Sequence, residues 1–95
     1  MTKPRLAPDE HEELGRVLAG ISDELQHRSI QLANAYPRSG PEAVPGKALE
    51  AAVRAIDDAR HALEDALYQE HPLSAETSVY FPPSEDRARI ERRWQ

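Results

Sequence analysis

The chain has 95 residues, which is the size of one small domain. Charged residues make up 31% of it, and the formal net charge of −5 disfavours nucleic-acid binding, because that function requires a basic surface. The absence of cysteine excludes disulfides, thiolate metal sites and cysteine nucleophiles. No apolar run is long enough for a transmembrane helix or a signal peptide, so we expect a cytoplasmic protein without membrane contact.

Residues 1–8 are expected to form a flexible N-terminal arm, and a helix is predicted over residues 9–36. Pro8 and the acidic residues after it mark its start, because proline suits a first turn and acids favour the positive end of the helix dipole. Pro37 ends it, since the residue before a proline is kept out of the α region. Its apolar residues follow the 3.6-residue period of a helix, namely Leu14, Leu18, Ile21, Leu25 and Leu32.

A second helix is predicted over residues 45–70, because it begins near Pro45 and ends before Pro72. Its main apolar stripe consists of Leu49, Val53, Ile56, Leu63 and Leu67. Each helix is about 40 Å long at 1.5 Å per residue. Matched lengths and a short connection predict an antiparallel helical hairpin over residues 9–71.

A second stripe, made only of alanines, runs beside the main stripe of this helix. Its members are Ala48, Ala52, Ala55, Ala59, Ala62 and Ala66. The two stripes together cover a sector of roughly 180°, about twice what one neighbouring helix covers. Alanine also suits exposed helical positions, but the charged residues gather on the opposite face. We therefore predict that the alanine stripe is an interface, at which two hairpins form a homodimeric four-helix bundle.

Residues 72–95 are predicted to form an extended strap and a short helix, because Pro82 and Pro83 favour extended backbone and Ser84 can cap a helix. The segment has three possible uses. In the first, Tyr80, Phe81, Ile90 and Trp94 cover the alanine stripe, instead of dimerisation or together with it. In the second, Tyr80 and Phe81 form either a recognition peptide or a strap over the protein's own core. In the third, the basic end with Arg92, Arg93 and Trp94 contacts the acidic bundle, a partner, or the phosphates and bases of a nucleic acid.

Two short motifs, Glu24-x-x-His27 and the looser Asp58-x-x-His61, resemble the metal ligands of di-metal four-helix proteins. On a helical wheel both motifs point away from the apolar faces, whereas such ligands must point into the bundle. The sequence therefore predicts no metal site and no cofactor. His11 and His71 lie at the ends of the predicted helices, where we assign them no chemical role.

Two arginines lie close to the apolar stripes. Arg28 occupies a position where the heptad spacing calls for an apolar residue, and Arg60 borders the stripe of the second helix. A buried arginine needs an acidic partner or a bound anion, so both a structural ion pair and an anionic-ligand site stay open.

The sequence therefore predicts an all-α, homodimeric, non-catalytic interaction or accessory protein with a protein partner. The alternative is a small helical enzyme or anionic-ligand binder that uses Arg28, followed by a di-metal carboxylate protein and a nucleic-acid-linked regulator. The chain contains no nucleophile elbow, phosphate-binding glycine loop or zincin motif, and so carries no recognisable catalytic signature.

Overall fold

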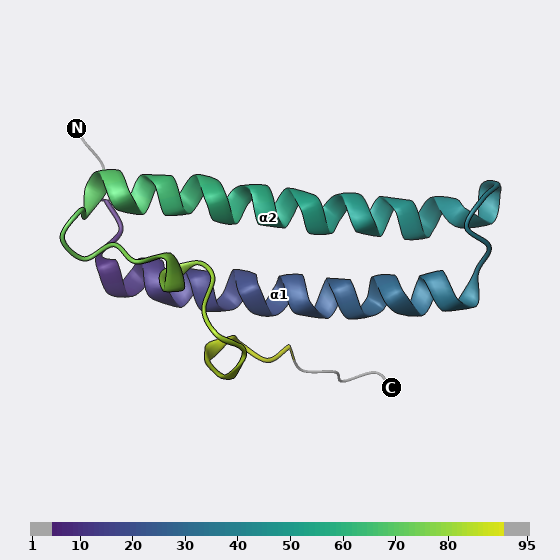
Figure 1. Ribbon diagram of the computed structural model, residues 1–95, viewed down its shortest axis with the longest axis horizontal. Helices are drawn as coiled ribbons and strands as arrows, with labels where there is room; N and C mark the ends of the chain where they lie inside the picture. Colours follow the sequence, from purple (N-terminus) through teal and green to yellow (C-terminus); the bar gives the residue numbers. More distant parts are fainter. Residues whose placement is uncertain (1–4, 91–95) are drawn as a thin grey trace.

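The computed structural model describes residues 5–90 as an antiparallel helical hairpin with a strap on one face (Figure 1). Helix α1 spans Pro8–Ala35 and helix α2 spans Val44–Glu70. Three 3₁₀ turns complete the order of elements, η1 over Pro41–Ala43 and η2 and η3 in the strap over Thr77–Val79 and Ser84–Asp86. The predicted all-helical hairpin is confirmed, and both helices begin and end within one residue of the predicted positions.

Prolines set the ends of both helices. Pro8 is the first residue of α1, and the Glu10 carboxylate accepts the backbone N–H of Ala7 at 2.9 Å, which satisfies one free donor at the helix start. Tyr36, just before Pro37, is already extended. The loop to α2 turns at Gly40, whose φ of +81° favours glycine because other side chains rarely adopt it.

The interior of the single chain is small. The apolar stripes of the two helices face each other, but most of their side chains are only half-buried. Half-buried residues include Leu14, Leu18, Ile21, Leu25 and Leu32 in α1 and Leu49, Val53, Ile56 and Leu63 in α2. The buried apolar side chains of the described part are those of Ala19, Ala43, Leu67, Tyr80 and Pro82. The molecule is elongated, with extents of 48 × 25 × 25 Å. Neither helix in residues 5–90 has the apolar length that crossing a membrane requires.

The strap turns back after α2, runs along α1 and crosses to its outer side (Figure 1). Two glycines of α1 permit this path. A methyl group at Gly15 would overlap the carbonyl oxygen of Val79, and one at Gly20 would overlap that of Ala88. The backbone N–H of Ala88 donates to the carbonyl oxygen of Arg16 at 3.1 Å, so the strap bonds directly to the helix backbone. Both glycines lower the helix propensity of α1, but they allow the strap backbone to approach the helix backbone closely.

The prediction of a short helix that begins at Ser84 is wrong for the described residues. The chain forms only the single turn η3, and Arg87 after it is extended, with φ −80° and ψ 143°. The backbone at this point bonds to α1 instead of continuing a helix of its own. Arg92, Arg93 and Trp94, predicted as a possible partner contact, lie outside the described residues.

Candidate functional site

Four polar side chains meet where α1 begins and α2 ends. His11 comes from the start of α1, Glu70 is the last residue of α2, His71 follows it, and Tyr80 comes from the strap. His11 is 2% exposed and Tyr80 0%, whereas Glu70 and His71 are half-buried. The antiparallel hairpin brings the first three together, and the strap adds the fourth when it turns back along α1. We call this group the end cluster.

His11 has a hydrogen-bond partner on each ring nitrogen. Its Nδ1 lies 2.5 Å from the hydroxyl of Tyr80, and its Nε2 lies 3.2 Å from Oε1 of Glu70. Because an ionised carboxylate only accepts, we assign the proton of the neutral ring to Nε2, and Nδ1 then accepts the hydroxyl proton of Tyr80. Burial, and to a lesser degree the charge of Glu70, raises the pKa of Tyr80, so this phenol stays a donor.

His71 packs edge-on against His11, with ring centroids 5.8 Å apart and an interplanar angle of 75°. Its Nε2 lies 2.7 Å from the carbonyl oxygen of Leu6, which can only accept, so Nε2 donates. The lone pair of the neutral ring is then on Nδ1. His11, Glu70 and His71 each place one ligand atom within 4.8 Å of the others. Two imidazoles and a carboxylate are a ligand set that suits zinc and related metals.

The sequence does contain a signal for part of this cluster. His11 precedes Leu18 by seven residues, and Glu70 follows Leu63 by seven, so both polar residues continue the apolar heptad spacing of their helices. A polar residue in such a position faces the neighbouring helix and needs a partner there. The contribution of Tyr80 depends on the path of the strap, which no local pattern gives.

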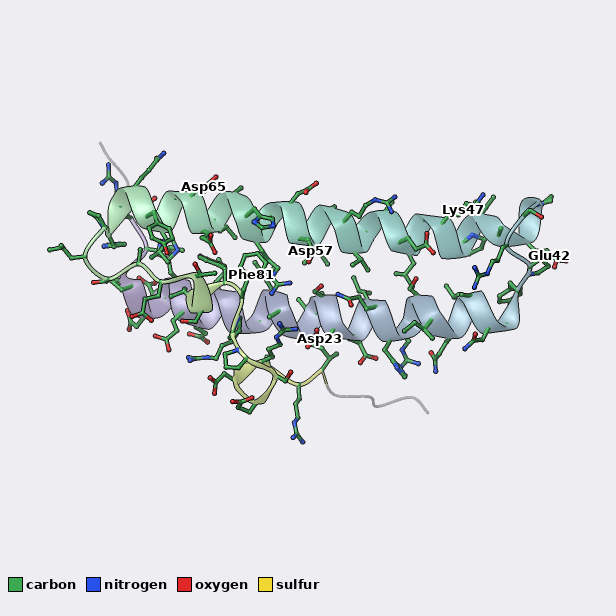
Figure 2. All side chains as sticks on the ribbon, viewed as in Figure 1. Asp23, Glu42, Lys47, Asp57, Asp65 and Phe81 are labelled. Carbon is green, nitrogen blue, oxygen red and sulfur yellow. The ribbon has the colours of Figure 1, made fainter. Side chains whose placement is uncertain are left out.

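Arg60 connects the two helices with the strap. It is 4% exposed, and its Nε donates to the backbone carbonyl of Tyr80 at 3.0 Å. Its Nη1 lies 3.1 Å from Asp57, which also accepts a hydrogen bond from Ser22 of α1 at 3.2 Å. The guanidinium lies 4.3 Å from the ring centroid of Phe81, which Figure 2 shows against the hairpin. These contacts favour the structural interpretation of Arg60.

Arg28, the other arginine considered for an anion site, lies at the surface with 37% of its side chain exposed. Its Nε pairs with Glu24 at 3.0 Å, and its Nη1 donates to Gln31 at 3.0 Å. All three residues belong to α1. The carboxylate beside the guanidinium opposes the binding of an anion. Arg28 and Arg60 share no partner, because Arg28 bonds within α1 whereas Arg60 bonds to Asp57 of α2 and to the strap.

The two metal motifs considered from the sequence do not form a common site. His27, Asp58 and His61 are exposed, as the helical wheel predicts. The ring of His61 packs against Phe81 of the strap, with centroids 4.8 Å apart. The metal-ligand geometry of the described residues therefore lies at the end cluster and not at either motif.

The alanine stripe lies on the face of the hairpin away from the strap. Helical periodicity places Gly15 and Ser22 of α1 and Asp57 and Arg60 of α2 on one face, where the strap runs, and the alanines on the other. Ala48, Ala55, Ala59 and Ala62 are exposed, and Ala52 and Ala66 are half-buried.

The alternative in which the C-terminal segment covers the alanine stripe is wrong for the residues described here. Tyr80 bonds to His11, and Phe81 packs on Arg60 and His61. Ile90, 40% exposed, follows the segment that crosses the outer side of α1. The two glycines of α1 permit this path, because a Cβ at either position would overlap the strap backbone. Trp94, the fourth residue of that alternative, lies outside the described residues.

The class of protein defined by this arrangement is a two-helix hairpin, strapped on one face and tied by a polar cluster at its open end. No protein-family model, no curated protein and no solved structure matches the chain. What the protein does is therefore inferred from its own residues.

Proposed function

We propose that the protein is a non-catalytic, homodimeric interaction protein, in which two copies pair through the hairpin face opposite the strap. The observation that carries this proposal is the exposure of the alanine stripe while the strap occupies the other face. A long apolar helix face without cover is typical of association sites. Because alanine side chains are small, they let two helix backbones approach closely along the whole stripe.

The size of a stable interface supports a four-helix arrangement. A helix of 27 residues is about 40 Å long and about 10 Å wide, so the footprint of α2 alone is about 400 Å². A standard interface takes about 800 Å² from each partner. The adjoining flank of α1 supplies the remainder, because Val17 is exposed and Ile21 is half-buried beside the stripe. Both helices of each copy then take part, as in a four-helix bundle.

The incomplete burial of the apolar stripes agrees with this proposal. The stripe residues of the two helices are mostly only half-buried in the single chain. Pairing would also cover half-buried stripe residues, at about 25 cal/mol of stabilisation for each Å² of apolar surface.

As an accessory protein, the dimer would offer its outer charged faces to a protein partner. We place this role in the cytoplasm, since small secreted domains commonly depend on disulfides and this chain has no cysteine. The end cluster and Arg60 hold the fold together in this proposal, and no residue is assigned a catalytic role.

The proposal is tested by the oligomeric state of the full chain. Size-exclusion chromatography with light scattering at micromolar protein should give about 21 kDa, twice the 10.7 kDa of the chain. Ala59→Glu places a charge in the middle of the stripe and should give monomers with unchanged helical content. Ala33→Glu is the matched control, because Ala33 is also an exposed helical alanine. It lies about five helical turns after Gly15 and so on the side of α1 away from the stripe. A monomeric wild type, or a dimer that tolerates Ala59→Glu, would contradict the proposal.

A further inference from the structure

We propose that His11, Glu70 and His71 bind one divalent transition-metal ion of the zinc type, with a water molecule as the fourth ligand. The three ligand atoms already lie within 4.8 Å of one another. In a tetrahedral site with bonds of about 2.0–2.1 Å, ligand atoms are about 3.3 Å apart. The His11 and Glu70 atoms are at 3.2 Å, so this pair already has the spacing of a tetrahedral site. The half-buried His71 would have to move its ligand atom closer from within 4.8 Å.

Each histidine has a hydrogen-bond partner on the ring nitrogen that would not bind the ion, as histidine ligands of metals usually do. A histidine ligand usually donates its second ring N–H to a neighbouring acceptor, which fixes the orientation of the ring. For His71 that acceptor is the carbonyl of Leu6, at 2.7 Å from Nε2, and Nδ1 is left for the ion. For His11 it is the hydroxyl oxygen of Tyr80, at 2.5 Å from Nδ1. When the ion takes the lone pair of Nε2, the proton of the neutral His11 ring moves to Nδ1. The Tyr80 hydroxyl then rotates its own proton out of this bond, and its oxygen accepts the proton of Nδ1.

The ligand types select the class of metal. Imidazole nitrogen with one carboxylate suits Zn²⁺ and neighbouring transition metals, whereas Ca²⁺ and Mg²⁺ prefer sites made of oxygen ligands. Glu70 is 25% exposed, so water can reach the fourth position. His11, Glu70 and His71 join the start of α1 to the end of α2, and Leu6 and Tyr80 add the N-terminal segment and the strap. A bound ion would therefore link the start of α1 directly to the end of α2, and the hydrogen bonds of its two histidines would join the N-terminal segment and the strap to the site.

The first test is a calorimetric titration of the chelator-treated full chain with Zn²⁺. We expect one ion per chain and a rise in Tm with Zn²⁺, because the ion binds the folded state. His71→Ala should weaken binding by at least about tenfold. His27→Ala is the control, since it removes an exposed histidine of α1 outside the cluster, and it should bind as the wild type does.

A second variant separates a metal ligand from a merely structural residue. Glu70→Gln keeps an oxygen that accepts the Nε2 proton of His11, so the fold without metal should keep its Tm, while the loss of charge weakens Zn²⁺ binding by at least about tenfold. Co²⁺ provides an independent readout, because a four-coordinate ion absorbs visible light more strongly than the hydrated ion. The proposal is overturned if no saturable binding occurs, if one ion binds per two chains, or if both variants bind like the wild type.

Discussion

Nδ1 of His11 and the phenolic oxygen of Tyr80 lie 2.5 Å apart, although 69 positions separate the two residues in the chain. Both side chains are buried, so neither polar group can turn to water if the bond is lost. The bond fixes the strap against the start of α1, and the ring of His11 at the same time reaches Glu70 at the end of α2. A single imidazole thus links three segments of a chain that has a small apolar core.

Tyr80→Phe is expected to destabilise the protein by about 1–3 kcal/mol, because it leaves Nδ1 of His11 buried without its partner. Tyr68→Phe is the matched control. The Tyr68 hydroxyl is 3.4 Å from Thr77 in an exposed setting, so its loss should change stability by less than about 0.5 kcal/mol. Urea unfolding of the two variants measures the difference. Equal effects of the two substitutions would show that the buried bond contributes nothing.

The helices were predictable because their signals are local. The apolar spacing from Leu14 to Leu32 gives the period of α1, and Pro8 and Pro37 give its ends within one residue. The exposure of most of the alanine stripe in the single chain also follows from the wheel, since one neighbouring helix covers only part of the apolar sector of α2. Periodicity is enough for such features because each turn of a helix repeats the same geometry.

The path of the strap and the complete end cluster were not predictable, because they depend on contacts between distant segments. From the sequence, Gly15 and Gly20 only lower the helix propensity of α1. The path of the strap shows why these positions have no side chain, because a Cβ there would overlap the strap backbone. Ser84 as a capping residue indicated a helix, but the backbone of Ala88 bonds to Arg16 instead. Local preference is worth a few tenths to about 1 kcal/mol per residue, so tertiary contacts of this kind override it.

Arg60→Met is expected to destabilise the protein by about 1–3 kcal/mol and to loosen the strap. The substitution keeps much of the buried volume but removes the hydrogen bond to the carbonyl of Tyr80 and the ion pair with Asp57. The Asp57 side chain is 40% exposed, so it can stay charged in contact with water. Arg54→Met is the control, because Arg54 is an exposed arginine of the same helix. Chemical unfolding gives the stability, and limited proteolysis of residues 72–83 reports the strap. Cleavage at the wild-type rate in Arg60→Met would contradict the assigned role.

The same substitution, glycine to alanine, should have opposite effects at different places in the hairpin. Gly15→Ala and Gly20→Ala should destabilise by about 1–3 kcal/mol, because the new methyl overlaps a carbonyl oxygen of the strap. Gly46→Ala in α2 should stabilise by up to about 1 kcal/mol, since its methyl would meet only the Cβ of Leu32 at an ordinary 3.8 Å. Thermal unfolding of the three variants measures the sign. Stabilisation by Gly15→Ala would mean that the strap does not lie on α1 there.

Two truncations separate the contributions of the two halves of the strap. A chain that ends at Pro83 keeps the contacts of Tyr80 and Phe81 and loses the Asp23–Arg87 ion pair. This pair is partly exposed, at 47% for Asp23 and 26% for Arg87, and is worth at most about 1 kcal/mol. It also loses the backbone bond of Ala88, so a moderate fall in Tm is expected.

A chain that ends at His71 loses much more. It leaves His11 and Arg60 without their strap partners and opens the face of α1 around Gly15 to water. We therefore expect this truncation to lower Tm several times more than the first, with loss of helical content at 37 °C measured by circular dichroism. Similar melting points for the two truncated chains would show that the strap contacts near Tyr80 do not stabilise the hairpin, and that the helices are held by their own stripes or by a second copy.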